Sequence, residues 1–189
     1  MNSAYDINNL NPDHQPIPDA IEAPSELTSS KAFRDWFQQS KVTTATGFPL
    51  MVFHGTARLN RKFGSTRHPD AEGAYFTNSF SDAKDYAEMD GSVEGDQPYV
   101  ISAFIRLNNP YRMYGVESHE ISTQLRDELI AAGYDGVTGA DEVTGEIWEY
   151  IVFDPSQIAP FHEGVIELPC SPARTRRFVA EAEYSSPAP

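Results

Sequence analysis

The chain has 189 residues and a formal net charge of −14, and its sequence pI is about 4.6. A chain of this length buries a sizeable core as one domain. Its acidic charge disfavours nonspecific binding to nucleic acid and to anionic membranes. Cys170 is its only cysteine, which excludes an internal disulfide and a thiolate metal cluster.

No run of about twenty apolar residues occurs, and the N-terminus lacks a basic-then-apolar signal sequence. We therefore expect a soluble protein made in a cytoplasm, without a membrane partner. The five histidines are scattered, so we expect no metal site.

The first part of the chain predicts a flexible leader and then a helix. Residues 1–28 are rich in Asn, Pro and Asp, and their prolines disfavour regular structure. Ser29 or Ser30 can cap a helix that ends near Gln39 and carries Phe33, Trp36 and Phe37 on one face. A strand over 50–53 should follow, with His54 at its end.

Further elements alternate along the middle of the chain. Strands are expected over 73–77, 99–107 and from Tyr134 onward, and helices over 79–89 and 118–132, the second closed by Gly133. The acidic segment 90–97 should be exposed. The pattern decays after Phe161, and residues 169–189 read as a flexible Pro/Ser-rich tail. The domain should thus span 29–168, and short strands without a βαβ rhythm predict an α+β fold.

The segment Ile147–Ile158 contains the most apolar strand pattern and an unexpected carboxylate. Alternation places Glu149 on an apolar face between Ile147 and Ile151. A buried carboxylate costs several kcal/mol unless it is paired or has a function. The alternative is a strand near an edge whose glutamate leans out to water, and the pattern favours neither.

Three further residues could belong to a functional site, although each could also have a purely structural role. His54 stands before a glycine and a threonine and could be a solvent-facing loop histidine. Tyr75 and Tyr86 could face each other across a flat ring, or could both be core aromatics. The chain lacks a G-x-G-x-x-G turn, a P-loop, a G-x-S-x-G elbow and an H-E-x-x-H motif.

Taken in order, these residues resemble the ADP-ribosyltransferases of the diphtheria-toxin and poly(ADP-ribose) polymerase branch, which is defined by a His–Tyr–Glu triad. The matching phrases are His54-Gly55-Thr56, then Gly73-Ala-Tyr75-Phe76 with Tyr86 eleven residues on, then Glu149-Tyr-Ile-Val-Phe-Asp154 with Gln157. The last phrase is the most specific.

The chain is more closely similar to the ADP-ribosyltransferase domains of phage and mobile-element polyvalent proteins. The shared phrases are Trp36-Phe-Gln-Gln-Ser-Lys-Val42, Gly47-Phe-Pro-Leu50, Asn109-Pro110 and Gly133-Tyr-Asp-Gly-Val137. The resemblance covers roughly residues 30–161. Ala83 stands where the polymerase branch has a serine that contacts the nicotinamide carboxamide. Ile147 stands where the arginine-modifying branch has a Glu or Gln, which disfavours arginine as acceptor.

The resemblance implies a split β-sandwich with flanking helices and an NAD cleft. It also implies catalytic roles for Glu149, His54 and Tyr75. Glu149 would hold the ribose hydroxyl and stabilise an oxocarbenium-like charge. The expected NAD-binding residues are those of the first two phrases, with two arginines placed by position alone: His54, Gly55, Thr56, Tyr75, Phe76, Tyr86, Arg58 and Arg61.

The implied function is NAD-dependent mono-ADP-ribosyl transfer to a macromolecule, with a protein acceptor favoured by the acidic charge. Such a domain could act as a phage or bacterial effector in the producing cell or in a host cell. Two alternatives stay open, namely an NAD glycohydrolase on the same scaffold and a catalytically idle NAD- or ADP-ribose-binding module.

Overall fold

The computed structural model describes residues 25–57, 73–90, 97–115 and 121–167, and for Asp90 and residues 162–167 it describes the backbone alone. Within these ranges seven strands form one sheet in the order β4-β5-β6-β2-β1-β3-β7. The elements are mixed, so the predicted α+β class is confirmed. The predictions for the leader up to Pro24, for most of the 90–97 segment and for the tail concern residues outside the described ranges.

The helices and strands follow one another along the chain as expected in most places. The helices are α1 (Ser25–Thr28), α2 (Lys31–Phe37), α3 (Phe80–Asp90) and α4 (Thr123–Ala131), with a short 3₁₀ helix at Pro155–Gln157. The strands are β1 (Val52–Thr56), β2 (Ala74–Thr77), β3 (Tyr99–Ile105), β4 (Tyr111–Tyr114), β5 (Gly136–Ala140), β6 (Ile147–Val152) and β7 (Ile158–Glu167).

Several of the sequence expectations need correction. The strand β4 was not expected, and α4 begins at Thr123, so Ile121 and Ser122 lie before the helix that was expected over 118–132. Residues 25–28 of the supposed leader are helical as α1, and the pattern does not decay after Phe161, because β7 runs to Glu167. The β1 strand continues to Thr56, so His54 lies within the strand instead of ending it. The reason is the backbone pairing with β3, which extends through His54↔Ile101 to Thr56↔Tyr99.

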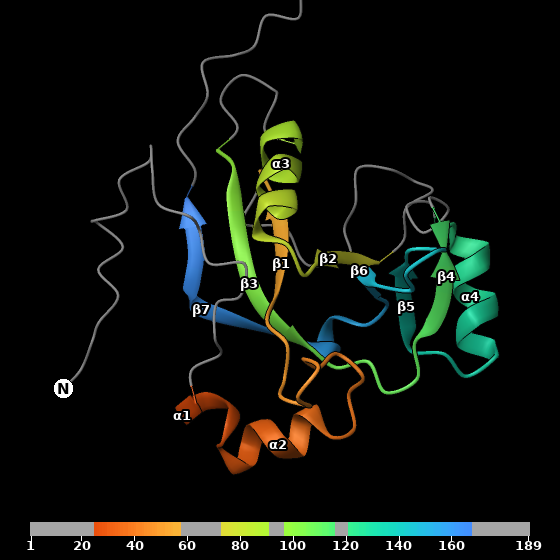
Figure 1. The fold of residues 1–189 in the computed structure, drawn as a ribbon, viewed down its shortest axis with the longest axis horizontal. Coiled ribbons are helices and arrows are strands. Elements are labelled where there is room, and N and C mark those ends of the chain that lie inside the picture. The colour runs from red at the N-terminus through yellow and green to blue at the C-terminus, as the bar shows by residue number, and fades with distance from the viewer. Residues whose placement is uncertain (1–24, 58–72, 91–96, 116–120, 168–189) are drawn as a thin grey trace, which may run out of the picture.

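The sheet narrows where β1 meets β2. These two strands share a single register pair, Phe53↔Thr77, whereas β1 and β3 share five and β2 and β6 share four. The half formed by β1, β3 and β7 and the half formed by β2, β6, β5 and β4 therefore diverge beyond this pair, as Figure 1 shows. The β4–β5 pair is parallel, and all the other strand pairs are antiparallel.

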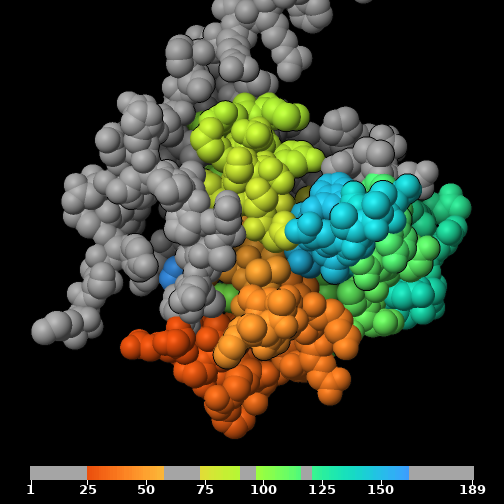
Figure 2. Space-filling model, in the orientation of Figure 1, coloured from red at the N-terminus to blue at the C-terminus, as the bar shows by residue number. Residues whose placement is uncertain are grey.

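Helices cover one face of the sheet in two places. The α2 and α3 helices pack on β1 and β3 through a cluster that includes Phe33, Phe53 and Phe104, and α4 packs on β5 and β6 beside Val137 and Ile151. Residues of the opposite face from both halves form another cluster, with Val52, Phe76 and Val152 among its members. Figure 2 shows the same view with all atoms, with α3 in yellow-green above the red and orange residues 25–57.

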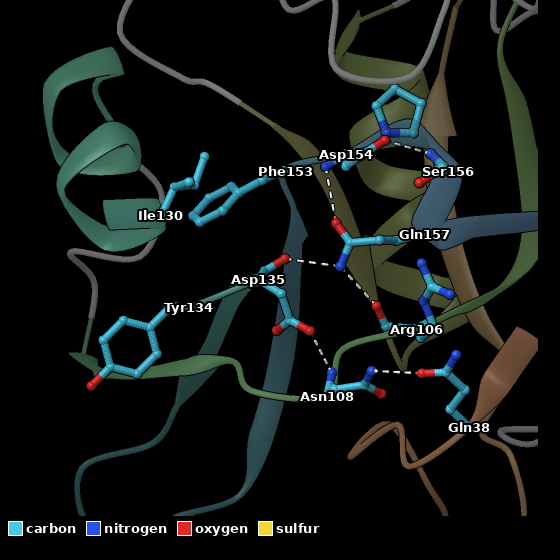
Figure 3. Close-up of a pocket in the computed structure, with 11 residues that line it drawn as sticks. Gln38, Arg106, Asn108, Ile130, Tyr134, Asp135, Phe153, Asp154, Ser156 and Gln157 are labelled. Carbon is cyan, nitrogen blue, oxygen red and sulfur yellow. Dashed lines mark hydrogen bonds between the residues drawn. The ribbon is translucent and has the colours of Figure 1, made fainter. Parts of the chain in front are cut away.

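Several of the phrases shared with the polyvalent proteins meet in one hydrogen-bonded latch. Gln157 Nε2 donates to the carbonyls of Arg106 and Asp135 at 2.9 Å each, and its Oε1 accepts from Asp154 N at 3.0 Å. The Asp135 carboxylate accepts from the backbone N–H groups of Asn108 and Asn109. The loops after β3, α4 and β6 are thereby held together, as Figure 3 shows in part.

We predict that Gln157→Glu lowers the free energy of unfolding by about 2–4 kcal/mol. A carboxylate at this 6%-exposed position cannot donate to the two carbonyls, and it places a charge beside them. Urea unfolding followed by circular dichroism measures the change. Gln124→Glu on α4, where the amide bonds to Glu128 on the exposed surface, is the matched control and should cost less than about 1 kcal/mol. Equal losses for the two variants would show that the latch contributes nothing special.

Candidate functional site

Glu149 is buried in the interior of the sheet. Its side chain is 5% exposed, and β6 lies between β2 and β5, so the reading as an edge-strand glutamate that leans out to water is wrong. Its register partners are Thr77 on β2 and Gly139 on β5. The same-face neighbours on β6 and β2 are Ile151 and Tyr75, which are also paired with each other.

The expected flank by Ile147 is wrong. The β5–β6 register shifts between Gly139 and Ala140, since Gly139 pairs with Glu149 but Ala140 pairs with Ile147. This irregularity breaks the strict alternation of side chains at the start of the strand. Ile147 accordingly packs against the cluster that contains Tyr150 and Val152, on the other side of the sheet from Ile151.

Tyr86 stands on the solvent side of α3 and close to Glu149. The inner side of the helix is made by Phe80, Ala83 and Ala87, and all three are buried in the core. Tyr86 is 47% exposed, so it is not a core aromatic. Its phenol pKa is raised above 10.0 by partial burial, and then by the negative charges of Glu149 and Asp82. A ring with an accessible face thus lies within electrostatic reach of the buried carboxylate.

Tyr75 lies on the same face of the sheet as Glu149 and is half-buried. It packs against the cluster of Ile121, Leu129, Val137 and Ile151, and the backbone N–H of Ile121 reaches its hydroxyl oxygen at 3.5 Å. Tyr75 is therefore in part a core aromatic, as one of the two alternatives expected. The ring occupies the same face of the sheet as Glu149, next to α4.

His54 crosses the gap that opens between β1 and β2. Its Nδ1 lies 2.7 Å from the Tyr75 carbonyl oxygen, and because a carbonyl only accepts, Nδ1 carries the proton. Nε2 is then the acceptor nitrogen of the neutral ring. The imidazole also lies 5.4 Å from the ring of Phe76, centroid to centroid. His54 thus bridges the two halves of the sheet where their backbone pairing has ended.

The neighbours of His54 in the first phrase are fixed by packing. A Cβ on Gly55 would lie 1.9 Å from the Ala83 carbonyl oxygen, so only glycine lets α3 lie this close to β1. Ala83 is fully buried at this contact. Thr56 and Phe76 are 7% and 2% exposed, so their side chains lie in the interior, and Phe76 packs on the opposite face of the sheet from Tyr75. Arg58 and Arg61 lie outside the described residues.

Two polar residues that contact β6 near Glu149 were missed in the sequence. Thr77 lies directly opposite it, and Asn78 follows at the turn into α3 and donates from Nδ2 to the Ile147 carbonyl at 3.0 Å. Both residues come straight after the Gly-x-Tyr-Phe phrase, in the stretch before a helix cap, where polar side chains commonly bond to backbone. That position is the signal that could have found them.

A shallow hollow of about 600 Å³ lies elsewhere, along the latch around Gln157. Its walls include Arg106, Tyr134 and Phe153, and none of the candidate site residues lines it (Figure 3). The amide of Gln157 and the carboxylate of Asp135 are turned onto loop backbone there instead of into the hollow. Glu149 and its neighbours therefore remain the candidate site. In the described ranges no three His, Cys, Asp or Glu side chains gather as metal ligands, and no helix is long and apolar enough to cross a membrane.

The proximity of Tyr86 and Glu149 has a measurable consequence. We predict that Glu149→Gln lowers the pKa of the Tyr86 phenol, because the phenolate no longer faces a carboxylate, while partial burial keeps the pKa above its ordinary value. NMR titration of ¹³C-labelled tyrosine rings, assigned with Tyr86→Phe, measures it. Asp82→Asn is the control and should lower the pKa by less, because Asp82 has the smaller effect. No change in Glu149→Gln would contradict the arrangement.

A search of curated proteins found no match. The family model described as "ADP-Ribosyltransferase in polyvalent proteins" matches residues 44–161, which is more than half of the chain and includes β1 to β6 with every candidate residue above. The chain therefore belongs to the family of ADP-ribosyltransferase domains of polyvalent proteins.

Proposed function

We propose that this domain cleaves the bond between nicotinamide and ribose in NAD and transfers ADP-ribose to a protein acceptor. The observation that carries the proposal is the Glu149 carboxylate, which is 95% buried on an interior strand beside the accessible ring of Tyr86, in a chain of this family. Membership supports ADP-ribosyl transfer in general, and the residues suggest how it proceeds.

Glu149 is suited to stabilising positive charge. When the bond breaks, nicotinamide leaves with the bonding electron pair and the ribose carbon becomes oxocarbenium-like, and the acceptor nucleophile then bonds to that carbon and loses its proton. A carboxylate held in a site of low dielectric stabilises such a charge more strongly than one in water. The strands on both sides fix its position before reaction.

The other residues fit recognition of the flat leaving group and the sugar. The Tyr86 ring offers a face for stacking, and Tyr75 lies on the same face of the sheet as Glu149. The Gly55 backbone would bind the carboxamide. The Nε2 of His54 would accept a hydrogen bond from a ribose hydroxyl, and its Nδ1 bond to the Tyr75 carbonyl sets that tautomer.

The split sandwich belongs to this proposal as well. The single pair that joins β1 to β2 leaves the two halves free to diverge, and NAD would lie across that divergence, between His54 and Glu149. Arg58 or Arg61, which follow His54 closely in the sequence, would neutralise the pyrophosphate of NAD, a role that rests on their position alone. A protein acceptor is supported by the net charge of −14, which disfavours nucleic acid.

The direct test is incubation of the pure protein with labelled NAD and a bacterial lysate, followed by a gel. Labelled protein together with nicotinamide release supports the transferase. Nicotinamide release without any labelled protein identifies an NAD glycohydrolase. Binding of NAD without release of nicotinamide identifies a binding module, and both of these outcomes contradict the proposal.

Glu149→Gln should lower turnover by roughly 10²–10³ while NAD affinity changes little, because the shape is kept and the charge is lost. Nicotinamide release gives the turnover, and a thermal melt checks that the fold remains. The amide is cheaper to bury than the carboxylate, so stability should hold or rise. Glu128→Gln on α4 is the control and should keep the wild-type rate. Wild-type turnover in Glu149→Gln would sink this mechanism.

Tyr86→Ala should weaken NAD binding by about 1–3 kcal/mol, the size of a lost stacking partner, with little effect on folding. Calorimetric titration with NAD measures the affinity. Tyr114 on β4 is 51% exposed, close to the 47% of Tyr86, so Tyr114→Ala is the matched control and should bind NAD as the wild type does. An equal loss in both variants would count against a specific stacking role.

A further inference from the structure

One side chain joins the two elements that carry Glu149 and Tyr86. Asn78 stands in the turn between the end of β2 at Thr77 and the start of α3 at Phe80, and it is half-buried. Its Nδ2 donates to the Ile147 carbonyl at 3.0 Å, although the two residues are 69 positions apart. Ile147 is the first residue of β6 and stands two residues before Glu149.

The start of β6 has less regular backbone pairing than the rest of the strand, so the Asn78 bond contributes most there. On one side the β2–β6 ladder ends at the pair Thr77↔Glu149, and the Asn78 amide continues it by one bond beyond that point. On the other side the β5 register shifts between Gly139 and Ala140. The preceding turn, residues 141–146, is largely exposed. A strand end with an irregular neighbour and an exposed approach is free to shift unless a side chain holds it.

The same turn also fixes the first residues of α3. Thr77 Oγ1 accepts from the backbone N–H of Ser79 at 3.0 Å, and Ser79 Oγ accepts from that of Asp82 at 3.2 Å. The Ser79 bond is an N-cap bond, and the Thr77 bond closes the turn just before it. Asn78 lies between these two residues, so its backbone is tied to the start of the helix while its side chain is bonded to β6.

We propose that Asn78 is a positioning residue that sets the Glu149 carboxylate relative to the Tyr86 ring by clamping the start of β6 to the start of α3. The role in catalysis rests on the proposed transferase function. Asn78 would not contact the reacting atoms. Its effect would pass through the Ile147 carbonyl to the strand that carries Glu149.

The test compares Asn78→Ala with Asn109→Ala. Asn109 Nδ2 also donates to a loop carbonyl at 3.0 Å, that of Gly133, but it does so in the latch away from Glu149. Each variant removes one amide donor from one backbone carbonyl. Asn78→Ala should lower kcat for nicotinamide release roughly ten- to hundredfold with a small change in KM, as misplacement of a catalytic group does. Asn109→Ala should keep the wild-type kcat.

The pKa of the Tyr86 phenol reports the geometry without any turnover. If the clamp holds Glu149 near Tyr86, Asn78→Ala should move this pKa toward its ordinary value, as Glu149→Gln does, and Asn109→Ala should leave it in place. Asn78→Leu keeps the side-chain bulk without the donor, and it replaces Asn78→Ala if the smaller side chain prevents folding. Thermal melts accompany each measurement.

The outcomes separate the clamp from the proposed function. An active wild type together with an Asn78→Ala variant that matches Asn109→Ala in kcat and in Tyr86 pKa overturns the clamp alone. A wild type that releases no nicotinamide overturns the function, and the Tyr86 pKa then still decides whether Asn78 sets the geometry. An unchanged pKa in a folded Asn78 variant overturns the clamp in either case.

Discussion

The arrangement depends on how little backbone pairing joins β1 to β2. One register pair, Phe53↔Thr77, connects strands that each have long ladders on their other sides. Because the pairing stops there, the strands diverge and the His54 imidazole reaches the Tyr75 carbonyl across the opening. A continuous ladder would have satisfied that carbonyl from the backbone. The interruption therefore fixes the tautomer of His54, which bonds to the strand β2 that carries Tyr75. The strand next to β2 on its other side is β6, which carries Glu149.

Two sets of contacts fix the segments around the opening between β1 and β2. The Gly55–Ala83 contact lets α3 lie directly on β1 and so brings Tyr86 over the sheet near Glu149. The Gln157 latch holds the loops at the other end, through amide and carboxylate groups that bind backbone on three segments. Gln157 bonds to three backbone groups and the Asp135 carboxylate to two, so several hydrogen bonds join these loops at once.

Whether a residue belongs to one of the shared sequence motifs does not decide what it contacts in the structure. Gln157 belongs to the most specific of the shared phrases, yet it binds loop backbone instead of facing Glu149. Asn78 belongs to no such phrase, yet it bonds to the first residue of the strand that carries Glu149. Membership of a motif thus marks both site residues and residues that hold loops, and the hydrogen bonds distinguish them.

Local patterns in the sequence were enough for the helix α2 with a serine cap at position 29 or 30, for strands β2, β3, β5 and β6, and for the phrases of the candidate site, and the structure places the cap at Ser30. Hydrophobic period and capping residues act within a few positions, so the sequence alone displays them. The tertiary structure decided four other features. These are the burial of Glu149, the exposure of Tyr86, the extension of β1 through His54, and the packing of Ile147 on the other face of the sheet. Each depends on which strand or helix lies alongside, and on a register irregularity, and such long-range pairings leave no periodic trace in the chain.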